Sequence, residues 1–410
     1  MPTDDRPLLL LISAGLERYR AYLFESMRTR YRIHLINTVE PTWERAYIVG
    51  HSVLPDLRTE DAVAEVARIA ATEPVAGVMS WDESKIIQTA WAARELGLPG
   101  GDPEAVLRCR DKFATREALF DAGVPQPAYA LVGDVEAAQI AADKIGYPVI
   151  LKPRAASASY GVVLVGDGAE VAAYFRYVAE TAVPHMPRYE REVLVEEYLP
   201  EAEISVDAAV YRGHVTPLFL GRKEVGFAPY FEETGHYVSH IDPLLRDPEL
   251  VGILTETHRA LGFTDGWTHS ELKLTEAGPK LIEVNGRLGG DLIPYVGQQA
   301  SGIDPGLVAA AIAVGRAPDM RPERDLVGGV RFCYVEQDDT TIDSVTFDES
   351  ALPPGIDLAV PLAQPGDVVS RPPKGIVSGR IAFITALGVS AEECRATLDA
   401  AQAALRVQAR

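Results

Sequence analysis

The sequence predicts a protein that combines a parallel α/β part with antiparallel α+β parts. Over roughly the first hundred residues, short apolar strands alternate with helical segments, which is typical of a parallel sheet with right-handed crossovers. Further along, two alternating runs flank a turn at 276–279 and indicate a β-hairpin. A strand-rich segment at 375–388 leads into a final helix. We therefore expect an N-terminal part at 1–100, a middle part at 101–320 and a C-terminal α+β part at 321–410.

The composition is that of a globular protein and limits its partners. The 410 residues are 47% hydrophobic and 24% charged, and the formal net charge is -20. Such a surface repels nucleic acid and anionic membranes, so an anion must bind in a local basic pocket. The apolar run 8–12 is too short to span a membrane, and Asp4 and Asp5 precede it where a signal peptide would carry positive charge. Three cysteines without a C-x-x-C pair favour a reduced cytoplasm.

The N-terminal part contains the predicted parallel sheet. We expect strands at 8–13, 32–37 and 75–79, with helices around 19–27 and from about residue 59. Ligands of such sheets gather at the carboxyl ends of the strands. Glu83 follows the strand at 75–79 at such an end, so it either contacts a substrate or caps the next helix. A run rich in glycine and proline at 96–102 marks the boundary with the middle part.

The first half of the middle part carries two lysines that are candidates for phosphate binding. Lys112 lies near the start of a predicted helix at 110–120, where a lone lysine is otherwise an ordinary surface residue. Lys152 lies on a strand that runs into a loop of small residues at 155–161. Such a loop exposes backbone N–H groups and hydroxyls beside the lysine, like a lid over phosphates, although an ordinary flexible hairpin is the alternative. The serines and the closing glycine of this loop are Ser157, Ser159 and Gly161.

An extended segment on either side of Pro200 follows the lid loop. Backbone donors and acceptors of an extended chain can bind an adenine edge, and carboxylates can accept hydrogen bonds from ribose hydroxyls. Alone, this pattern is a weak signal for a nucleotide. The candidate residues of the segment are Glu196, Glu197, Tyr198, Leu199 and Glu203.

The hairpin is the stretch around which the rest of the chain is organised. Along its second strand Glu283 and Asn285 point one way, whereas Ile282 and Val284 point into packing. If the connecting loop has an odd number of residues, Glu271 lies opposite Glu283, and two adjacent carboxylates need a cation. Mg²⁺ takes hard oxygen ligands together with substrate phosphates, so the hairpin predicts a Mg-nucleotide site. A polar, solvent-facing sheet surface is the alternative.

Two further groups of residues are substrate candidates. The hairpin continues into Asn-Gly-Arg-Leu-Gly-Gly-Asp, which adds a fixed cation and glycines that let the backbone approach a ligand. The last aspartate either contacts a substrate amine or caps a helix. The segment 229–243 concentrates acidic and imidazole groups beside aromatic residues, although it could equally be a surface loop. The residues concerned are Arg287, Gly289, Gly290 and Asp291 in the first group and Glu233, His236 and His240 in the second.

The order of these pieces resembles the ATP-grasp superfamily. A lysine-bearing helix, a lysine strand with a small-residue loop, a Glu-Glu-Tyr-Leu segment and a Glu…Glu-x-Asn-x-Arg hairpin follow one another between 102 and 298. The resemblance implies an ATP-grasp fold with a lid subdomain at about 126–198, and ATP with Mg²⁺ or Mn²⁺ as cofactors. It places Lys112 and Lys152 on the phosphates. It also implies that adenine and ribose bind at 196–203 and that the metal ligands are Glu271, Glu283 and Asn285.

Within that superfamily the Glu-x-x-His segment and the C-terminal part are similar to the L-amino-acid ligases, which form dipeptides. The resemblance implies that ATP converts a carboxylate into an acyl phosphate, which an amine then attacks. Arg287 would stabilise the oxyanion, and Glu233 or His236 would recognise or deprotonate the amine. The partners would be a small carboxylate and a small amine, and relatives are commonly homodimers. An ATP-dependent carboxylase that uses bicarbonate, and a non-catalytic nucleotide-binding protein, stay open as alternatives.

Overall fold

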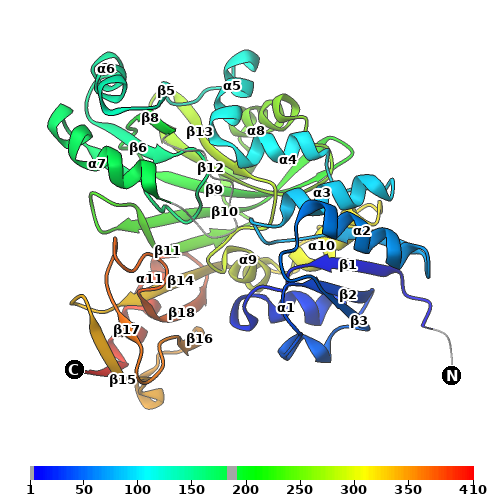
Figure 1. Cartoon of the computed structure of the whole chain (residues 1–410). Helices are drawn as coiled ribbons and strands as arrows, with labels where there is room; N and C mark the ends of the chain where they lie inside the picture. The colour runs from blue at the N-terminus through cyan, green and yellow to red at the C-terminus, as the bar shows by residue number, and fades with distance from the viewer. Residues whose placement is uncertain (1–3, 182–191) are drawn as a thin grey trace.

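The N-terminal part is a parallel sheet flanked by helices. The computed structural model describes residues 4–181 and 192–410, and the N-terminal sheet lies at the lower right of Figure 1. Its strand order is β3-β2-β1-β4 and all three pairings are parallel, which confirms the prediction. Its elements are β1 Leu8–Ile12, α1 Glu17–Met27, β2 Arg32–Asn37, η1 Trp43–Ala46, β3 Gly50–Val53, α2 Thr59–Ala70, β4 Val75–Met79 and α3 Ile86–Glu95.

Two helices lead from this sheet to a small antiparallel sheet with the order β5-β8-β6-β7. The helix predicted at 110–120 starts later, because the Asp111 side chain caps it by accepting hydrogen bonds from Phe113 and Ala114. The predicted lid includes residues 182–191, which lie outside the described residues. The elements are α4 Pro103–Arg110, α5 Lys112–Ala122, β5 Tyr129–Val132, α6 Val135–Ile145, β6 Val149–Pro153, β7 Val163–Val165, α7 Gly168–Glu180 and β8 Val193–Glu197.

An eight-stranded sheet forms the centre of the molecule. Its order is β13-β12-β9-β10-β11-β14-β18-β16, and all its pairings are antiparallel. Helices α8, α9 and α10 pack around it (Figure 1). The elements up to residue 313 are β9 Glu203–Tyr211, β10 His214–Gly226, β11 Glu232–Ser239, η2 Pro243–Arg246, α8 Pro248–Leu261, β12 Gly266–Thr275, β13 Gly278–Asn285, α9 Ile293–Ser301 and α10 Pro305–Ala313.

The C-terminal part extends the same central sheet. Strands β14, β18 and β16 continue it beyond residue 320, and a separate three-stranded sheet has the order β17-β15-β19. The boundaries predicted at 100 and 320 therefore stay a prediction. The elements are β14 Val327–Tyr334, β15 Thr340–Phe347, η3 Glu349–Ala351, β16 Ile356–Pro361, β17 Val368–Val369, β18 Arg380–Gly388, α11 Ala391–Ala403 and β19 Leu405–Ala409.

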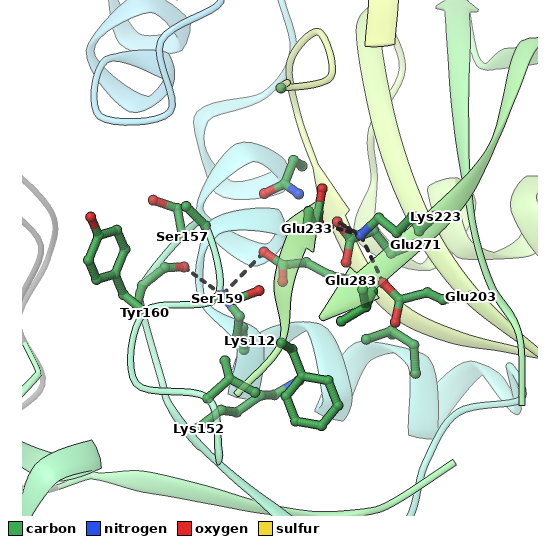
Figure 2. Close-up of a pocket in the computed structure, with 18 of the residues that line it drawn as sticks. Lys112, Lys152, Ser157, Ser159, Tyr160, Glu203, Lys223, Glu233, Glu271 and Glu283 are labelled. Carbon is green, nitrogen blue, oxygen red and sulfur yellow. Dashed lines mark hydrogen bonds and ion pairs between the residues drawn. The ribbon is translucent and has the colours of Figure 1, made fainter. Parts of the chain in front are cut away.

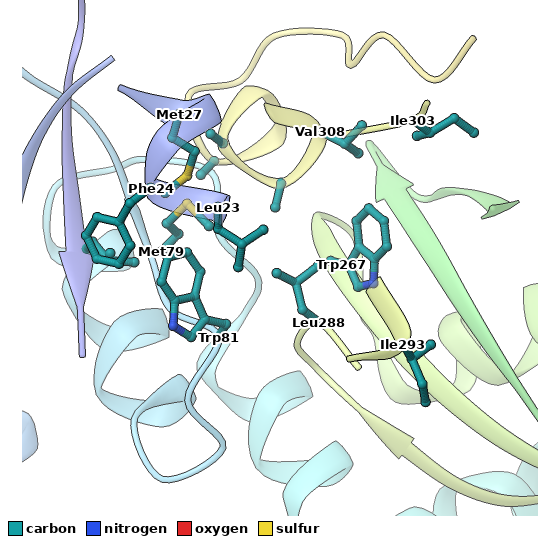
Figure 3. Packing of buried hydrophobic residues seen from close by; sticks show 14 of the residues in the cluster. Leu23, Phe24, Met27, Met79, Trp81, Trp267, Leu288, Ile293, Ile303 and Val308 are labelled. Carbon is teal, nitrogen blue, oxygen red and sulfur yellow. The ribbon is translucent and has the colours of Figure 1, made fainter. Parts of the chain in front are cut away.

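A continuous apolar core joins the N-terminal part to the central sheet. Figure 3 shows Phe24 and Trp81 of the N-terminal part facing Leu288 and Trp267 of the middle part. Burying this many large side chains favours a fixed position of the carboxyl ends of β1 and β4 against the end of β13. The three cysteines are buried and unpaired. Among the described helices, none combines the length and the apolarity that a membrane crossing needs.

Candidate active site

One cavity of about 270 Å³ lies beneath the lid loop and collects most of the predicted site residues. Residues of the N-terminal part, the lid, the central sheet and the C-terminal part line the cavity. Four predicted residues are not in its wall: Gly161, His236, His240 and Gly289. The predicted residues that line it are Glu83, Lys112, Lys152, Ser157, Ser159, Glu196, Glu197, Tyr198, Leu199, Glu203, Glu233, Glu271, Glu283, Asn285, Arg287, Gly290 and Asp291.

The hairpin register brings the two predicted metal carboxylates together. Glu271 pairs directly with Glu283, although the condition set for this pairing, an odd number of residues in the connecting loop, is not met. The turn itself contains two residues, an even number. The odd residue comes instead from a bulge at Ile282, which shifts the register between Leu272 and Glu271. The bulge also turns Ile282 into the cavity wall, so the prediction that Ile282 points into packing is wrong.

The lid end of the cavity contains a buried ion cluster. Lys152 lies 2.6 Å from Glu196, whose other oxygen accepts a 2.8 Å hydrogen bond from Arg116 Nε. Burial opposes ionisation of Glu196, but the charges of Arg116 and Lys152 outweigh it and lower its pKa to about 2. Burial lowers the pKa of Lys152. Arg116 was not predicted. The cluster holds Lys152 rigidly beneath the lid loop.

Lys112 connects the lid loop to the hairpin. Its ammonium donates a 2.7 Å hydrogen bond to the Ala156 carbonyl and lies 3.2 Å from Glu283 (Figure 2). Both serines of the lid loop face the same cavity, and Ser159 has a positive φ of 56°. A lysine, two serine hydroxyls and a tightly curved backbone are suitable groups for a phosphate chain.

Lys223 is the main cavity residue that the sequence analysis missed. It lies on β10, its side chain is 1% exposed, and its ammonium contacts three carboxylates (Figure 2). The distances are 2.8 Å to Glu203, 2.7 Å to Glu233 and 2.8 Å to Glu271. Burial opposes the charge of Glu271, yet Lys223 holds the pKa of that carboxyl well below its usual range. A lone lysine in the run Leu-Gly-Arg-Lys-Glu-Val gave no signal of this arrangement.

Arg287 is fixed by the N-terminal part. Its Nε lies 2.5 Å from Glu83 Oε2, and Glu83 also lies 3.4 Å from Arg110. The following helix α3 starts at Ile86 with Lys85 as its N-cap, so Glu83 does not cap it. Glu83 is therefore the acid that orients Arg287. Burial opposes the charge of Arg287, but Glu83 raises the pKa of the guanidinium.

A second charge cluster lies where β11 meets the end of the hairpin segment. The His236 Nε2 atom is 3.2 Å from Glu233 and 3.9 Å from Asp291. Among the described residues, these three side chains offer ligand atoms within 4.8 Å of one another. Arg380, also missed from the sequence, holds Asp291 with two contacts of 2.6 and 3.0 Å. His236 is fully buried behind the two carboxylates, which themselves face the cavity.

Three of the four predicted residues outside the cavity wall are Gly161, Gly289 and His240, and their surroundings show where each one lies. A Cβ on Gly161 would meet Pro153 and Thr181 within 3 Å, so this glycine permits close packing at the base of the lid loop. A Cβ on Gly289 would meet Asp207 and His269. His240 follows the opposite end of β11 from Glu233, about 20 Å along the strand, and contacts Asp325. His240 is therefore remote from the cavity.

The lid loop contacts the C-terminal part across the cavity. The Tyr160 hydroxyl donates a 2.7 Å hydrogen bond to the Ile376 carbonyl. The next residue, Val377, has a positive φ of 58° and lines the cavity. Its backbone N–H donates to Glu232, which also accepts from Tyr334 and Arg380. The cavity is thus bounded on this side by residues of the C-terminal part.

The donor set at the hairpin suits a hard divalent cation. Glu271 and Glu283 are directly opposite, and the Asn285 amide lies beside them, with its nitrogen 3.2 Å from Glu283 Oε1 in its hydrogen-bonded orientation. In the structure Lys223 and Lys112 compensate the two carboxylates. Two carboxylates and an amide, beside lysines able to take phosphates, are the donor types that Mg²⁺ shares with a nucleotide.

Comparison with known proteins identifies the family. The lid sheet above a central antiparallel sheet is the arrangement of an ATP-grasp fold, and residues 145–295 match the ATP-grasp domain family. Protein y4rH of Sinorhizobium fredii, described as uncharacterized, is 30% identical over 397 residues, which cover 94% of this chain and 79% of that protein. The chain belongs to the ATP-grasp family.

Other relatives have stated activities. Carnosine synthase 1 of Gallus gallus is 28% identical over 79% of this chain, and alanine–anticapsin ligase of Bacillus subtilis is 28% identical over 64% of it. The chain spans only 37% and 59% of these two relatives. The crystal structure of an L-amino acid ligase from Bacillus licheniformis superposes with a TM-score of 0.81 at 23% identity, covering 99% of both chains. The biotin carboxylase domain of Hydrogenobacter thermophilus 2-oxoglutarate carboxylase, solved with magnesium ADP and bicarbonate, superposes with a TM-score of 0.72 at 17% identity, covering 98% of this chain and 90% of that one.

Proposed function

We propose that the chain is an ATP-dependent carboxylate–amine ligase that joins two amino acids through an acyl phosphate and releases ADP and phosphate. The observation that carries the proposal is that two kinds of group face one cavity: lysines suited to phosphates, and the paired carboxylates Glu233 and Asp291, suited to an ammonium group. A bicarbonate substrate has no ammonium group, so those carboxylates would keep only their contacts with Lys223, His236 and Arg380. The dipeptide-forming relatives support the same reaction class.

The first step transfers the γ-phosphoryl group of ATP to the donor carboxylate. A carboxylate oxygen forms the new bond to phosphorus as the bond to the ADP oxygen breaks. Lys112 and Lys152 spread the phosphate charge. Magnesium or manganese, held by Glu271, Glu283 and Asn285, would supply further charge neutralisation when bound.

In the second step the amine nitrogen attacks the acyl carbon, and the bond to the phosphate oxygen breaks. Arg287, oriented by Glu83, stabilises the negative charge that develops on the carbonyl oxygen. The proton lost by the amine passes to Glu233 or to His236 behind it. The loop 155–161 excludes water, which would otherwise hydrolyse the acyl phosphate.

A screen of amino-acid pairs tests the proposal. Purified protein with Mg-ATP is offered each pair, and ADP, phosphate and the dipeptide mass are measured. We expect ADP release that requires both amino acids and is matched by dipeptide. Release that requires bicarbonate instead would identify a carboxylase, and nucleotide binding without any release would identify a non-catalytic protein. Arg287→Ala should lower turnover by about a hundredfold or more; full turnover in this variant would refute the role of Arg287.

Two expectations about the whole protein belong to the proposal. We infer a homodimer because dimers are common in the superfamily, and the mass of the particle in solution tests it. We also infer a cytoplasmic location, which the three unpaired cysteines support. Fractionation of cells that produce the full-length protein tests the location.

A further inference from the structure

A buried pair of an acid and an imidazole lies beside the paired carboxylates of the hairpin. His269 on β12 is directly opposite Asp207 on β9 and, on its other side, opposite Asn285 on β13. Asp207 is completely buried and His269 is 4% exposed. The His269 Nδ1 atom lies 2.8 Å from Asp207 Oδ1, within hydrogen-bond distance. Neither side chain takes part in the proposed reaction, although His269 lines the cavity.

The alternation along β12 puts His269 on the same face as Glu271. Side chains two residues apart on a strand point the same way, and both of these line the cavity. The His269 Nε2 atom lies 3.5 Å from Glu271 Oε1, the same oxygen that Lys223 contacts at 2.8 Å. One ring nitrogen therefore faces a carboxylate in the protein interior, and the other faces a predicted metal ligand.

The backbone at Gly289 covers the acid–imidazole pair closely. A Cβ at this position would lie 2.9 Å from Asp207 Oδ2 and 3.0 Å from His269 Nδ1, so a side chain here would push the pair apart. Asp207 Oδ2 accepts no hydrogen bond from the described residues. A buried ion pair with an unsatisfied oxygen is weak evidence of a stabilising role. The pair is better explained by the carboxylate that His269 faces on its other side.

Lys223 alone does not fix the direction of the Glu271 carboxylate. Its ammonium is shared with Glu203 and Glu233, and phosphates in the cavity would compete for it. The imidazole is different, because Asp207 holds its ring in place. An imidazole between two carboxylates favours its charged form, with a proton on each nitrogen. Since Asp207 balances that charge, the pair can orient Glu271 and still leave its charge for a divalent cation.

We propose that His269, held by Asp207, is a positioning residue that orients Glu271 for the divalent cation of the nucleotide. The inference rests on the proposed function and adds two residues to it. Hydrogen-bonding partners of this kind commonly orient metal-binding carboxylates. Loss of the Nε2 contact should therefore weaken the contribution of the metal, and leave the binding of metal-free nucleotide as it is.

The test measures the dissociation constant of ADP calorimetrically, once with Mn²⁺ and once with EDTA. The ratio of the two constants reports how much the metal strengthens nucleotide binding. In His269→Asn the amide can still bond Asp207, but nothing replaces Nε2. We expect this variant to lower the ratio by about 10- to 100-fold, or to one, with the constant in EDTA unchanged. His269→Gln, whose amide reaches the place of Nε2, should restore part of the ratio. KM values for the amino acids at saturating metal should stay unchanged.

The matched control is His258→Asn, the same substitution at another buried imidazole. His258 bonds the Thr268 hydroxyl and the Leu254 carbonyl and is not among the residues that line the cavity. Its replacement should lower the urea midpoint and leave the ratio unchanged. A loss of stability alone would therefore not imitate the expected effect.

Two outcomes separate the inference from the proposed function. An unchanged ratio in a folded His269→Asn protein overturns the inference alone. Should that variant fail to fold, Asp207→Asn decides instead, because it keeps the imidazole and removes the charge that holds it; an unchanged ratio there has the same meaning. If wild-type protein binds ADP equally well with Mn²⁺ and with EDTA, the metal site of the proposed function is wrong, and the inference with it.

Discussion

Replacing Lys223 with methionine should expose how much the central charge cluster depends on one ammonium group. Methionine keeps the length and apolar stem of the side chain and removes the charge. The carboxylates of Glu203, Glu233 and Glu271, all within 2.8 Å of Lys223 Nζ, would then face one another without a cation. Removing one partner from a buried ion pair costs about 3–5 kcal/mol. We expect a loss of stability in this range at pH 7.5.

The free energy of unfolding should depend on pH differently in wild type and in Lys223→Met. In wild type, burial opposes ionisation but Lys223 keeps the pKa values of Glu233 and Glu271 below their usual range. The stability that these lowered pKa values contribute is fully present above the ordinary glutamate pKa. It is lost as the pH falls through the lowered values. Without the ammonium, burial and mutual repulsion raise these pKa values. The folded variant then binds more protons than its unfolded chain, so its stability rises as the pH falls towards 5.5.

Urea unfolding midpoints at pH 7.5 and 5.5 measure both effects. The control is Lys374→Met, which removes an exposed lysine paired with Asp339 and should cost no more than about 1 kcal/mol. We expect a large deficit for Lys223→Met at pH 7.5 and a smaller one at pH 5.5. Equal losses in the two variants, or a deficit that does not shrink at the lower pH, would refute the reasoning.

Three further predictions concern the metal, the lid and a buried imidazole. Glu271→Gln should raise the Mg²⁺ concentration for half-maximal ADP release by at least about tenfold, whereas Glu276→Gln in the exposed turn should not. Tyr160→Phe removes the hydrogen bond to Ile376 and should increase ADP release without an amine about 2- to 10-fold, measured against coupled turnover. Burial lowers the pKa of His258 to about 4, so wild-type stability should fall between pH about 6.5 and 4; His258→Gln should flatten this slope in urea midpoints.

Local patterns in the sequence were sufficient for much of the fold. The run at 8–12 is uniformly apolar, and apolar and polar residues alternate at 271–275 and 282–285, because a buried parallel strand and a half-buried hairpin impose those periods on neighbouring residues. The alternation placed Glu283 and Asn285 on one face, whereas the pairing of Glu271 with Glu283 was predicted only for a connecting loop with an odd number of residues. The bulge at Ile282 was not predicted, because the adjacent apolar residues Leu281 and Ile282 interrupt the alternation without indicating which residue is left unpaired.

Residues that depend on distant partners could not be found this way. Lys223 has its three acids on β9, β11 and β12, and Arg380 reaches Asp291 from a strand that starts 89 residues later. Such contacts are set by strand order, which a single sequence does not specify. His240 is the converse case: it is only four residues from His236 in sequence, but the strand carries it away from the cavity.

The ion pairs of the cavity imply that nucleotide and metal bind together. Lys112 is paired with Glu283 and Lys223 with Glu271, so phosphates that take these lysines would release both carboxylates. Two released carboxylates on adjacent strands repel each other unless a divalent cation joins them. Conversely, a cation that takes the carboxylates frees the lysines for phosphates. Since coupling free energy is reciprocal, each ligand must strengthen the binding of the other. In this way a chain with a negative net charge can bind a polyanion at a site whose lysines are paired with carboxylates before the ligand arrives.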